Sequence, residues 1–547
     1  MSKTAPDTVV AHAEDIGVET AVQLTVGLDT TTKAKQAAQT EHDLTVREAI
    51  RKYPRALFWC LMVCMCVVME GYDLNLLNNF YAYPAFAKRY GTYNEATDNY
   101  QLSAAWQAGL GNASGIGAFF GTLLNGYLVT KWGHVRVLIG ALVTLSALIF
   151  IVFFAPNAGV LLAGQVLCGL PWGIFATTAP AYASEVVPMS LRVYLTSYTN
   201  MCFIMGQLIA AGVLAGLVSN DTAWAYRIPF AIQWFWPVIL VPILCFAPDT
   251  PWHLVRIGRE DDAEKSLRRL RPNASDEEIR ETLGLIVYTN RLEEELSVGT
   301  SYRDCFKGDE LRRTEIACMT FAGQIFSGLY FAYNSTYFFQ QVGLDSQTTY
   351  YLNVGGNAMG LFACFVAWFA IMPYVGRRTA YVWGMFAMGV ILYVIGALNT
   401  RTSNDSVAMV QAVLTLIWTF TFQLSAGQLG WALPAEIGST RLRQKTICLA
   451  RNAYAICAVI AGVLQPYFMN PTEWNLKGYT GFFWGTTAFL VFVWAFFRLP
   501  ETKDRTFEEL NLLFAKKVSA RKFKTYHVEA FGDEDPLQKV KTEHSQV

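Results

Sequence analysis

Two carboxylates interrupt a long apolar run near the start of the chain. The stretch VVMEGYDLNLLNNF, residues 67–80, holds Glu70 and Asp73 inside a run that begins at Trp59. Side chains three residues apart share one face of a helix, so two ionised carboxylates here would repel each other. Each would also cost at least about 2.5–3.5 kcal/mol near the centre of a bilayer. Such a pair persists where it lines water, pairs with a cation or takes up a proton, which is the chemistry of proton coupling.

A structural explanation of the same pair is also open. One carboxylate could cap a broken helix near Gly71 or hold a neighbouring helix. The candidate counter-charge is Arg451 in LARNAYAI, the deepest basic residue of the apolar blocks. Its side chain is also long enough to reach the membrane surface from that position. The sequence therefore leaves two placements for the guanidinium, one beside the acids and one at the interface.

The composition shows why acids are unusual in this setting. The chain has 547 residues, of which 53% are hydrophobic and 16% are charged, whereas soluble proteins carry about 25% charged residues. The apolar residues gather in blocks of about the 20 residues that cross a bilayer as a helix. The net charge is zero, which predicts no nucleic-acid partner. The expected partner is a lipid bilayer that the chain crosses many times.

Cysteines and histidines predict neither a metal nor a cofactor. Of the eleven cysteines, only Cys305 lies in a charged loop, and none lies in a predicted outer loop. This pattern predicts no disulfide framework. No histidine and cysteine cluster has the spacing of a metal site. All six histidines lie outside the predicted spans, so histidine is a poor candidate for a proton relay in the membrane.

The apolar blocks predict an all-α membrane protein with twelve transmembrane helices in two six-helix halves. The expected spans lie near 56–78, 104–128, 135–155, 158–184, 194–217 and 228–247, and then near 315–339, 351–373, 379–398, 407–433, 446–468 and 480–499. The predicted parts of the chain are a flexible cytosolic tail at 1–54, a first half at 55–247, a small cytosolic helical domain at 248–313, a second half at 314–500 and a cytosolic tail at 501–547. In the central domain, Ser275 and Glu278 have the spacing of a capping box.

An internal repeat supports the two halves independently of hydropathy. YASEVVPMSLR in the first half matches PAEIGSTRLR in the second, KWGHVR matches YVGRR, and PDTP matches PETK. Three markers in one order indicate parallel repeats, the major facilitator architecture, with a substrate site at mid-membrane between the halves. The charged and glycine positions of these motifs are expected to hold or gate the cytosolic ends, with anchoring at the interface as the alternative. They are Glu185, Arg192, Glu436, Arg443, Gly133, Arg136, Gly376 and Arg377.

Lysine and arginine in the short loops set the expected orientation. They gather on the side shared with the central domain and both tails. Because positive loops face the cytosol, both termini are predicted to be cytosolic. The expected location is the plasma membrane.

These motifs resemble the sugar porter family of the major facilitator superfamily over roughly 55–515. GYD, PAYASEVVPMSLR, PETK with TFEEL, and the paired Gly-Arg loops carry the resemblance. VMEGYD, GQVLCGLPWG, LARNAY and PTEWN are similar to fungal maltose and α-glucoside permeases, which are proton symporters. The resemblance implies that Asp73, rather than Glu70, is the main coupling residue, because the family motif GYD centres on it.

The chain departs from the family pattern at several positions. Thr130 and Pro373 replace the aspartate of the two loop motifs, and Gln165 stands where many sugar porters have an arginine facing the aspartate of GYD. The second span has no carboxylate, whereas related proton-coupled permeases carry one there. These departures bear on coupling and not on the fold.

Sugar recognition calls for neutral hydrogen-bonding groups and flat aromatic faces. Asn200 and Gln207 are seven residues apart on one helix face. The resemblance implies substrate contacts at these two and at further amides and aromatics of the spans, although membrane amides also bond helix to helix and Trp172 could serve packing alone. The candidates are Gln207, Gln324, Trp431, Asn200, Asn452, Asn334, Tyr333, Gln165 and Trp172.

The expected function is import of a disaccharide such as maltose or another α-glucoside together with a proton. Alternatives are a facilitative uniporter, a permease for β-linked cellobiose or lactose, and a sugar sensor of the same fold. An enzyme is not expected, because the chain has no HExxH or GxSxG motif and no paired catalytic carboxylates at the membrane face.

Overall fold

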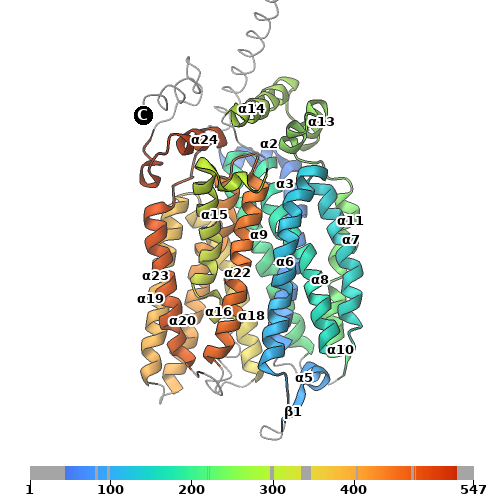
Figure 1. Cartoon of the computed structure of the whole chain (residues 1–547), viewed down its shortest axis with the longest axis vertical. Coiled ribbons are helices and arrows are strands. Elements are labelled where there is room, and N and C mark those ends of the chain that lie inside the picture. The colour runs from blue at the N-terminus through green and yellow to red at the C-terminus, as the bar shows by residue number, and fades with distance from the viewer. Residues whose placement is uncertain are drawn as a thin grey trace, which may run out of the picture.

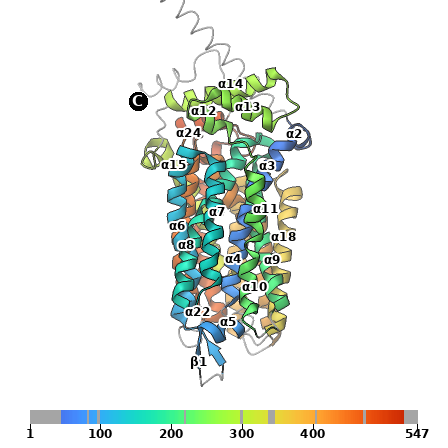
Figure 2. The same ribbon diagram turned by 90° about the vertical axis from the view of Figure 1, so that its right-hand side faces the viewer.

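The chain forms a bundle of long helices standing side by side (Figure 1). The computed structural model describes residues 44–80, 84–94, 99–217, 220, 222–295, 301–333, 335, 346–401, 405–469, 474 and 476–526. Short helices cover one end of the bundle, called here the α14 end. A short helix and a two-stranded hairpin lie at the opposite end, called here the β1 end (Figures 1 and 2).

The first half of the bundle contains two interrupted helices and four continuous ones. The first predicted span is divided at Met65, and the sixth at Gln233 and Trp234. The bounds are α3 (Pro54–Cys64), α4 (Cys66–Phe80), α6 (Ala104–Trp132), α7 (His134–Phe153), α8 (Ala158–Val186), α9 (Met189–Leu217), α10 (Trp224–Ile232) and α11 (Phe235–Leu244).

The second half repeats this arrangement, with breaks in its first and fourth members. Gly328, at φ +97°, separates α15 from α16 in a conformation that favours glycine. The bounds are α15 (Gly308–Phe326), α16 (Leu329–Tyr333), α18 (Ser346–Val366), the π-helical η2 (Ala367–Ile371), α19 (Arg377–Leu398), α20 (Asp405–Leu424), α21 (Ala426–Ile437), α22 (Arg443–Met469) and α23 (Thr480–Arg498).

Ten segments of the described chain are long and apolar enough to cross a membrane, and they account for ten of the twelve predicted spans. The remaining two predictions fall on α6 and on α15 with α16. Both run within the bundle (Figure 1). The first is rich in glycine and polar residues, and the second starts among charged residues, so neither is as apolar as the others. For these two segments, crossing the membrane remains a prediction.

Some expected boundaries were wrong for identifiable reasons. The fifth predicted span began at 194, whereas α9 begins at Met189 because the Pro188 carbonyl accepts from the Leu191 and Arg192 N–H groups. His134 was expected outside the spans, yet it is the buried first residue of α7. Its backbone N–H donates to the Asp249 carboxylate at 3.1 Å, which starts the helix there.

Helical structure also extends into both predicted tails. Capping boxes explain this, since Thr45 pairs with Glu48 and Thr506 with Glu509. The predicted box of Ser275 and Glu278 is confirmed by two reciprocal 3.2 Å hydrogen bonds. The short elements are α2 (Val46–Lys52), α12 (Pro251–Arg256), α13 (Glu260–Leu270), α14 (Asp276–Glu295), η1 (Asp304–Phe306), α24 (Phe507–Ala515) and η5 (Ala520–Lys522) at the α14 end, and α5 (Pro84–Tyr90), β1 (Thr92–Asn94) and β2 (Asn99–Gln101) at the β1 end; η3 (Asn399–Arg401) and η4 (Lys477–Tyr479) adjoin α19 and α23.

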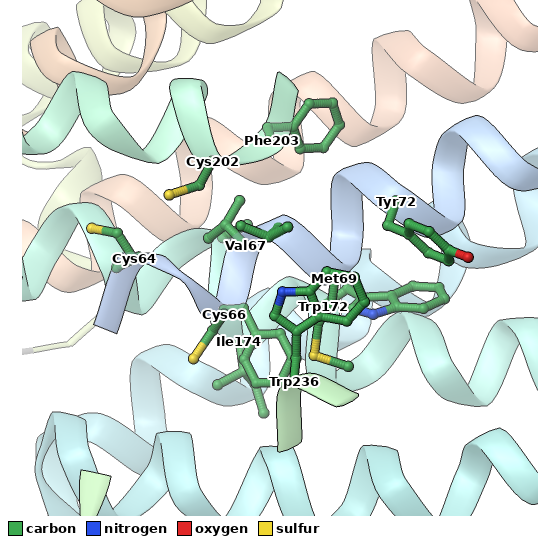
Figure 3. Close-up of a cluster of buried hydrophobic side chains, with 14 of the residues drawn as sticks. Cys64, Cys66, Val67, Met69, Tyr72, Trp172, Ile174, Cys202, Phe203 and Trp236 are labelled. Atoms are coloured by element: carbon green, nitrogen blue, oxygen red, sulfur yellow. The ribbon is translucent and has the colours of Figure 1, made fainter. Parts of the chain in front are cut away.

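Helix α4 is held at the centre of the first half by a close crossing with α9. A Cβ atom on Gly71 would lie 2.0 Å from the Phe203 carbonyl oxygen, and one on Gly206 would lie 2.0 Å from that of Val68. Around this crossing, side chains of α4 pack against Trp172, Phe203 and Trp236 from three other helices (Figure 3). The crossing therefore determines where the two carboxylates of α4 lie.

The substitution Gly71→Ala tests this crossing. Because the new methyl group would meet backbone of α9, the two helices must separate, and we expect a loss of about 1–3 kcal/mol in the free energy of unfolding. The measurement is the thermal unfolding midpoint of the detergent-purified protein. Gly115→Ala is the matched control, since nothing lies within 4 Å of its added Cβ. Equal midpoints for the two variants would contradict the proposed role of the crossing.

Candidate functional site

A buried ion pair joins the two halves at the centre of the bundle. Arg451 of α22 donates from Nη2 to Oε1 of Glu70 on α4. Both residues are buried. The guanidinium also lies 4.5 Å from the ring of Tyr454 and 5.1 Å from that of Trp431. Arg451 therefore turns toward the acids, and the alternative placement at the membrane surface does not hold in this structure.

Asp73 has a different environment, made of neutral amides. It is 1% exposed, and its Oδ1 accepts a 2.6 Å hydrogen bond from Nε2 of Gln233. Within the described ranges, Oδ2 has no hydrogen-bond partner and no cation forms an ion pair with Asp73. Gln165 is fully buried, and neither polar atom of its side chain has a partner among those residues. The two carboxylates of the apolar run therefore have different partners. Among the residues that the structure describes, Glu70 is paired with a cation and Asp73 is not.

Both carboxylates line one central cavity of about 60 Å³. Its walls come from both halves, with α4, α6, α8 and α9 on one side and α16 and α22 on the other. The polar and aromatic lining residues are Glu70, Asp73, Asn112, Ser114, Thr122, Trp172, Tyr330, Tyr333, Arg451 and Tyr454. A cavity of this size and polarity can hold water, so a proton or a hydroxyl-bearing molecule would meet both acids in the same space.

Five of the predicted site residues line this cavity, namely Glu70, Asp73, Arg451, Trp172 and Tyr333. The Nε1–H group of Trp172 donates no hydrogen bond to any described residue. It is therefore an unpaired buried donor beside the cavity. Asn334 lies outside the described residues.

The other predicted contacts lie near the cavity but make bonds between helices. Gln324 donates to the carbonyls of Ala426 and Gly427 at 3.1 and 2.9 Å and so holds the start of α21. Asn200 donates to Gln423 of the other half at 2.8 Å.

The remaining candidates, Asn452, Gln207 and Trp431, contact neighbouring helices in three different ways. Asn452 accepts from Thr122 across the halves. Gln207 accepts at its backbone oxygen from Asn75 at 2.7 Å. Trp431 forms part of the aromatic wall around Arg451, and its ring lies 5.1 Å from that of Phe321. The predicted substrate roles of these residues remain predictions.

Sequence reasoning missed Gln233, Asn112 and Tyr454. The Gln233 amide sits in the break between α10 and α11, and its polar type inside an apolar block was the available signal. Asn112 lies in the glycine-rich stretch GNASGIGAFFG, where small residues outnumber polar ones. Tyr454 follows Arg451 by one helical turn, a spacing that places both on one face.

Toward the β1 end, a series of asparagine amides links the halves. Asn357 of α18 donates to Asn353 at 2.6 Å, and Asn353 donates to Asn79 of α4 at 3.0 Å. Asn79 donates in turn to Asn75 at 3.0 Å. The crossing from one half to the other is made by neutral groups, so it can form and break without uncovering a charge.

Toward the α14 end, the contacts between halves are charged. Glu185 of α8 accepts from Arg256 at 2.5 Å and lies 3.8 Å from Arg443 of α22. Arg256 also donates to the Thr440 carbonyl of the second half at 2.9 Å. Burial lowers the pKa of His253, in α12 beside this network, to about 4, so its imidazole adds no charge at neutral pH.

The paired arginines of the repeat meet on one aromatic ring. Arg192 of the first half and Arg443 of the second lie 3.6 and 3.7 Å from the ring centre of Phe507 on α24. Glu436 accepts from Thr502 at 2.6 Å and lies 3.9 Å from Arg377. The charged residues of the repeat therefore bind groups from distant parts of the chain, and not the charged residue seven positions away in the same motif.

In both halves, the glycine of the repeat leaves room for a carboxylate that binds the start of the next helix. A Cβ on Gly133 would meet the Asp249 carboxylate, and one on Gly376 would meet that of Glu501. Glu501 accepts from the Arg377 backbone N–H at 2.7 Å, as Asp249 does from that of His134. Arg136 is exposed. Thr130, at the first departure from the family motif, accepts a 2.8 Å bond from Lys445 across the halves.

Comparison with known proteins gives consistent results. A family model described as "Sugar (and other) transporter" matches residues 59–514. The alpha-glucosides permease MPH2 of Saccharomyces cerevisiae is 38% identical over 518 residues, covering 93% of this chain and 85% of the relative. The maltose permease MAL31 of the same organism is 38% identical over 505 residues, covering 91% and 82%.

The fold is also found among solved structures. That of the proton:xylose symporter XylE bound to 6-bromo-6-deoxy-D-glucose aligns with a TM-score of 0.74 at 19% identity, covering 84% of this chain and 99% of the other. This likeness establishes the major facilitator fold, and the named relatives are permeases rather than enzymes. With the match over 59–514 and the 38% identity to the relatives, the chain is a multi-pass membrane protein that belongs to the sugar transporter family.

Proposed function

We propose that the protein is a plasma-membrane carrier that imports an α-linked disaccharide, such as maltose, together with a proton. The names of the yeast relatives, α-glucoside and maltose permeases, support the substrate class. The single observation that carries the coupling is Asp73, a buried carboxylate that meets no cation among the residues described and faces the same cavity as the ion pair that joins the halves.

Asp73 is the proton carrier in this proposal, and Glu70 is not. An ionised carboxylate in an apolar interior costs several kcal/mol unless a partner compensates for it. Glu70 has its compensation in Arg451. In the described part of the chain, Asp73 faces neutral amides and no cation, so uptake of a proton removes a charge that nothing else compensates. Protonation of Asp73 and binding of the sugar are then linked through the cavity that they share.

Alternating access follows from the two sets of contacts around that cavity. At about 60 Å³, the cavity is far smaller than the roughly 300 Å³ of a ligand pocket. Loading a disaccharide therefore requires the halves to part. Release of the Asn79–Asn353 amide contact would open the β1 end, and release of the Glu185–Arg443 and Arg256–Thr440 contacts would open the α14 end.

The orientation follows from charge. Basic residues of the short connections cluster at the α14 end, which by the positive-inside rule faces the cytosol. Both termini and the α12–α14 segment then lie in the cytosol. The basic residues are Lys131, Arg136, Arg192, Arg377, Arg378, Arg441, Arg443 and Lys445.

A facilitative uniporter is the alternative that particular residues favour. Gln165 replaces the arginine expected to face Asp73, and no carboxylate of α6 lines the cavity. The β-linked disaccharides cellobiose and lactose are alternative substrates, and a sugar sensor is an alternative use of the same fold. Labelled-sugar uptake at two external pH values in a transporter-free host distinguishes these possibilities.

The substitution Asp73→Asn tests the coupling. We expect sugar-induced alkalinisation of a lightly buffered suspension and uphill accumulation to be lost, because an amide cannot carry the proton. Exchange of internal for external sugar should remain, because this step needs no net proton movement. Asp261→Asn, at an exposed position of α13, is the matched control and should accumulate sugar normally. Full accumulation by Asp73→Asn would show that the coupling residue lies elsewhere.

The ion pair is tested by removing one charge and then both. Glu70→Gln leaves the Arg451 charge buried without its partner, which should cost about 3–5 kcal/mol in the free energy of unfolding. The double variant Glu70→Gln/Arg451→Gln removes both charges and should recover part of that loss. The readout is the thermal midpoint and the amount of protein at the cell surface. The single variant Arg451→Gln completes the cycle. If the double variant loses, relative to wild type, the sum of what the two single variants lose, the two charges act independently.

A further inference from the structure

A second cavity, separate from the central one, lies at the α14 end between the two halves. It measures about 230 Å³. Its walls are the start of α9 from the first half, the segment leading into α19 from the second half, residues 502–505 with Leu510, and the beginning of α2. It shares no lining residue with the central cavity. We call it the Arg377 cavity.

The charge of this cavity is predominantly basic. Four basic side chains line it, Arg192, Arg377, Lys503 and Arg505, against the two acids Glu436 and Asp504. Glu436 accepts from the Thr502 hydroxyl at 2.6 Å, and Lys503 donates to the Pro373 carbonyl at 2.6 Å. These partners are neutral, so all six groups keep their charge and the four cations outnumber the two acids. The balance favours a ligand that carries negative charge.

Arg377 has buried N–H donors that lack an acceptor. The residue is 8% exposed, and its Nε and Nη1 groups have no hydrogen-bond acceptor among the residues described. The Glu436 carboxylate, at 3.9 Å from Nε, is too distant to accept. A guanidinium always keeps its proton donors, and a buried donor without an acceptor is destabilising. The buried hydroxyl of Ser190, also in the lining, has no partner in the described chain either.

We propose that the Arg377 cavity binds a phosphate group. Planar guanidinium groups match the spacing of two phosphate oxygens and bind them through paired hydrogen bonds. A lysine adds charge without demanding a direction, and Lys503 lies in the same lining. The phosphate belongs to either a lipid headgroup of the inner leaflet or a soluble phosphate monoester, since both present the same oxygens.

The position of the cavity gives the phosphate a consequence for transport. Arg192 comes from the first half and Arg377 from the second, and the cavity walls come from both. A phosphate that contacts both halves stabilises the arrangement in which the α14 end is closed. Resting on the proposed function, this makes the bound phosphate an inhibitor of opening toward the cytosol.

The binding is tested on the full-length protein in detergent, without any transport assay. Inorganic phosphate and glucose phosphate, each compared with chloride at equal ionic strength, probe a soluble source. Phosphatidylcholine with or without phosphatidylinositol phosphate, added as mixed micelles with the detergent, probes a lipid source. The readout is the shift in thermal unfolding midpoint with ligand concentration. We expect at least one of the phosphate probes to raise the midpoint and chloride to leave it unchanged.

The variants assign the site. Arg377→Gln should weaken the phosphate effect at least tenfold. Arg378→Gln is the matched control, because that side chain lies outside the cavity and bonds the Phe496 carbonyl at 2.7 Å. If Arg377→Gln fails to fold, Lys503→Gln takes its place with the same expectation. A response to lipid alone, or to soluble phosphate alone, supports the site and identifies the source. No response to any phosphate probe, or an equal response in wild type and both cavity variants, overturns the proposal.

Discussion

The desolvation of charge inside an apolar bundle is the constraint on which this structure depends. Arg451 and Glu70 lie on different halves, and each is stable in the interior only while the other is present. The aromatic rings of Trp431 and Tyr454 complete the surroundings of the guanidinium. The pair therefore does more than compensate for two charges, because it links α4 of the first half to α22 of the second.

The contacts between halves change in character along the bundle. They are neutral amides toward the β1 end, one ion pair in the middle, and several charged groups toward the α14 end. Neutral amides separate at low cost because each can bond to water instead, whereas buried charges separate only where water can reach them. The two ends therefore differ in what it takes to open them.

The sequence predicted the helices, the repeat and the two acids, because these follow from hydropathy and from spacing along one chain. It did not predict which acid pairs with Arg451, since that depends on how α4 and α22 approach. The amides of Gln324 and Asn200 bond helix to helix in the structure, one of the two roles that the sequence left open, and their contact with sugar remains a prediction. The sequence did not identify Gln233, because a break between α10 and α11 brings its amide to Asp73. Amino-acid composition predicts such breaks poorly.

The carboxylates of Asp249 and Glu501 connect the last helix of each half to the start of that half's third helix. Each connection is made entirely within one half and requires nothing from the other. During synthesis, the first half can thus be locked into its own bundle as soon as Asp249 has emerged, while the second half has yet to be made. The same arrangement lets each six-helix half rotate afterwards as a rigid body. Only the contacts at the interface between the halves then have to change.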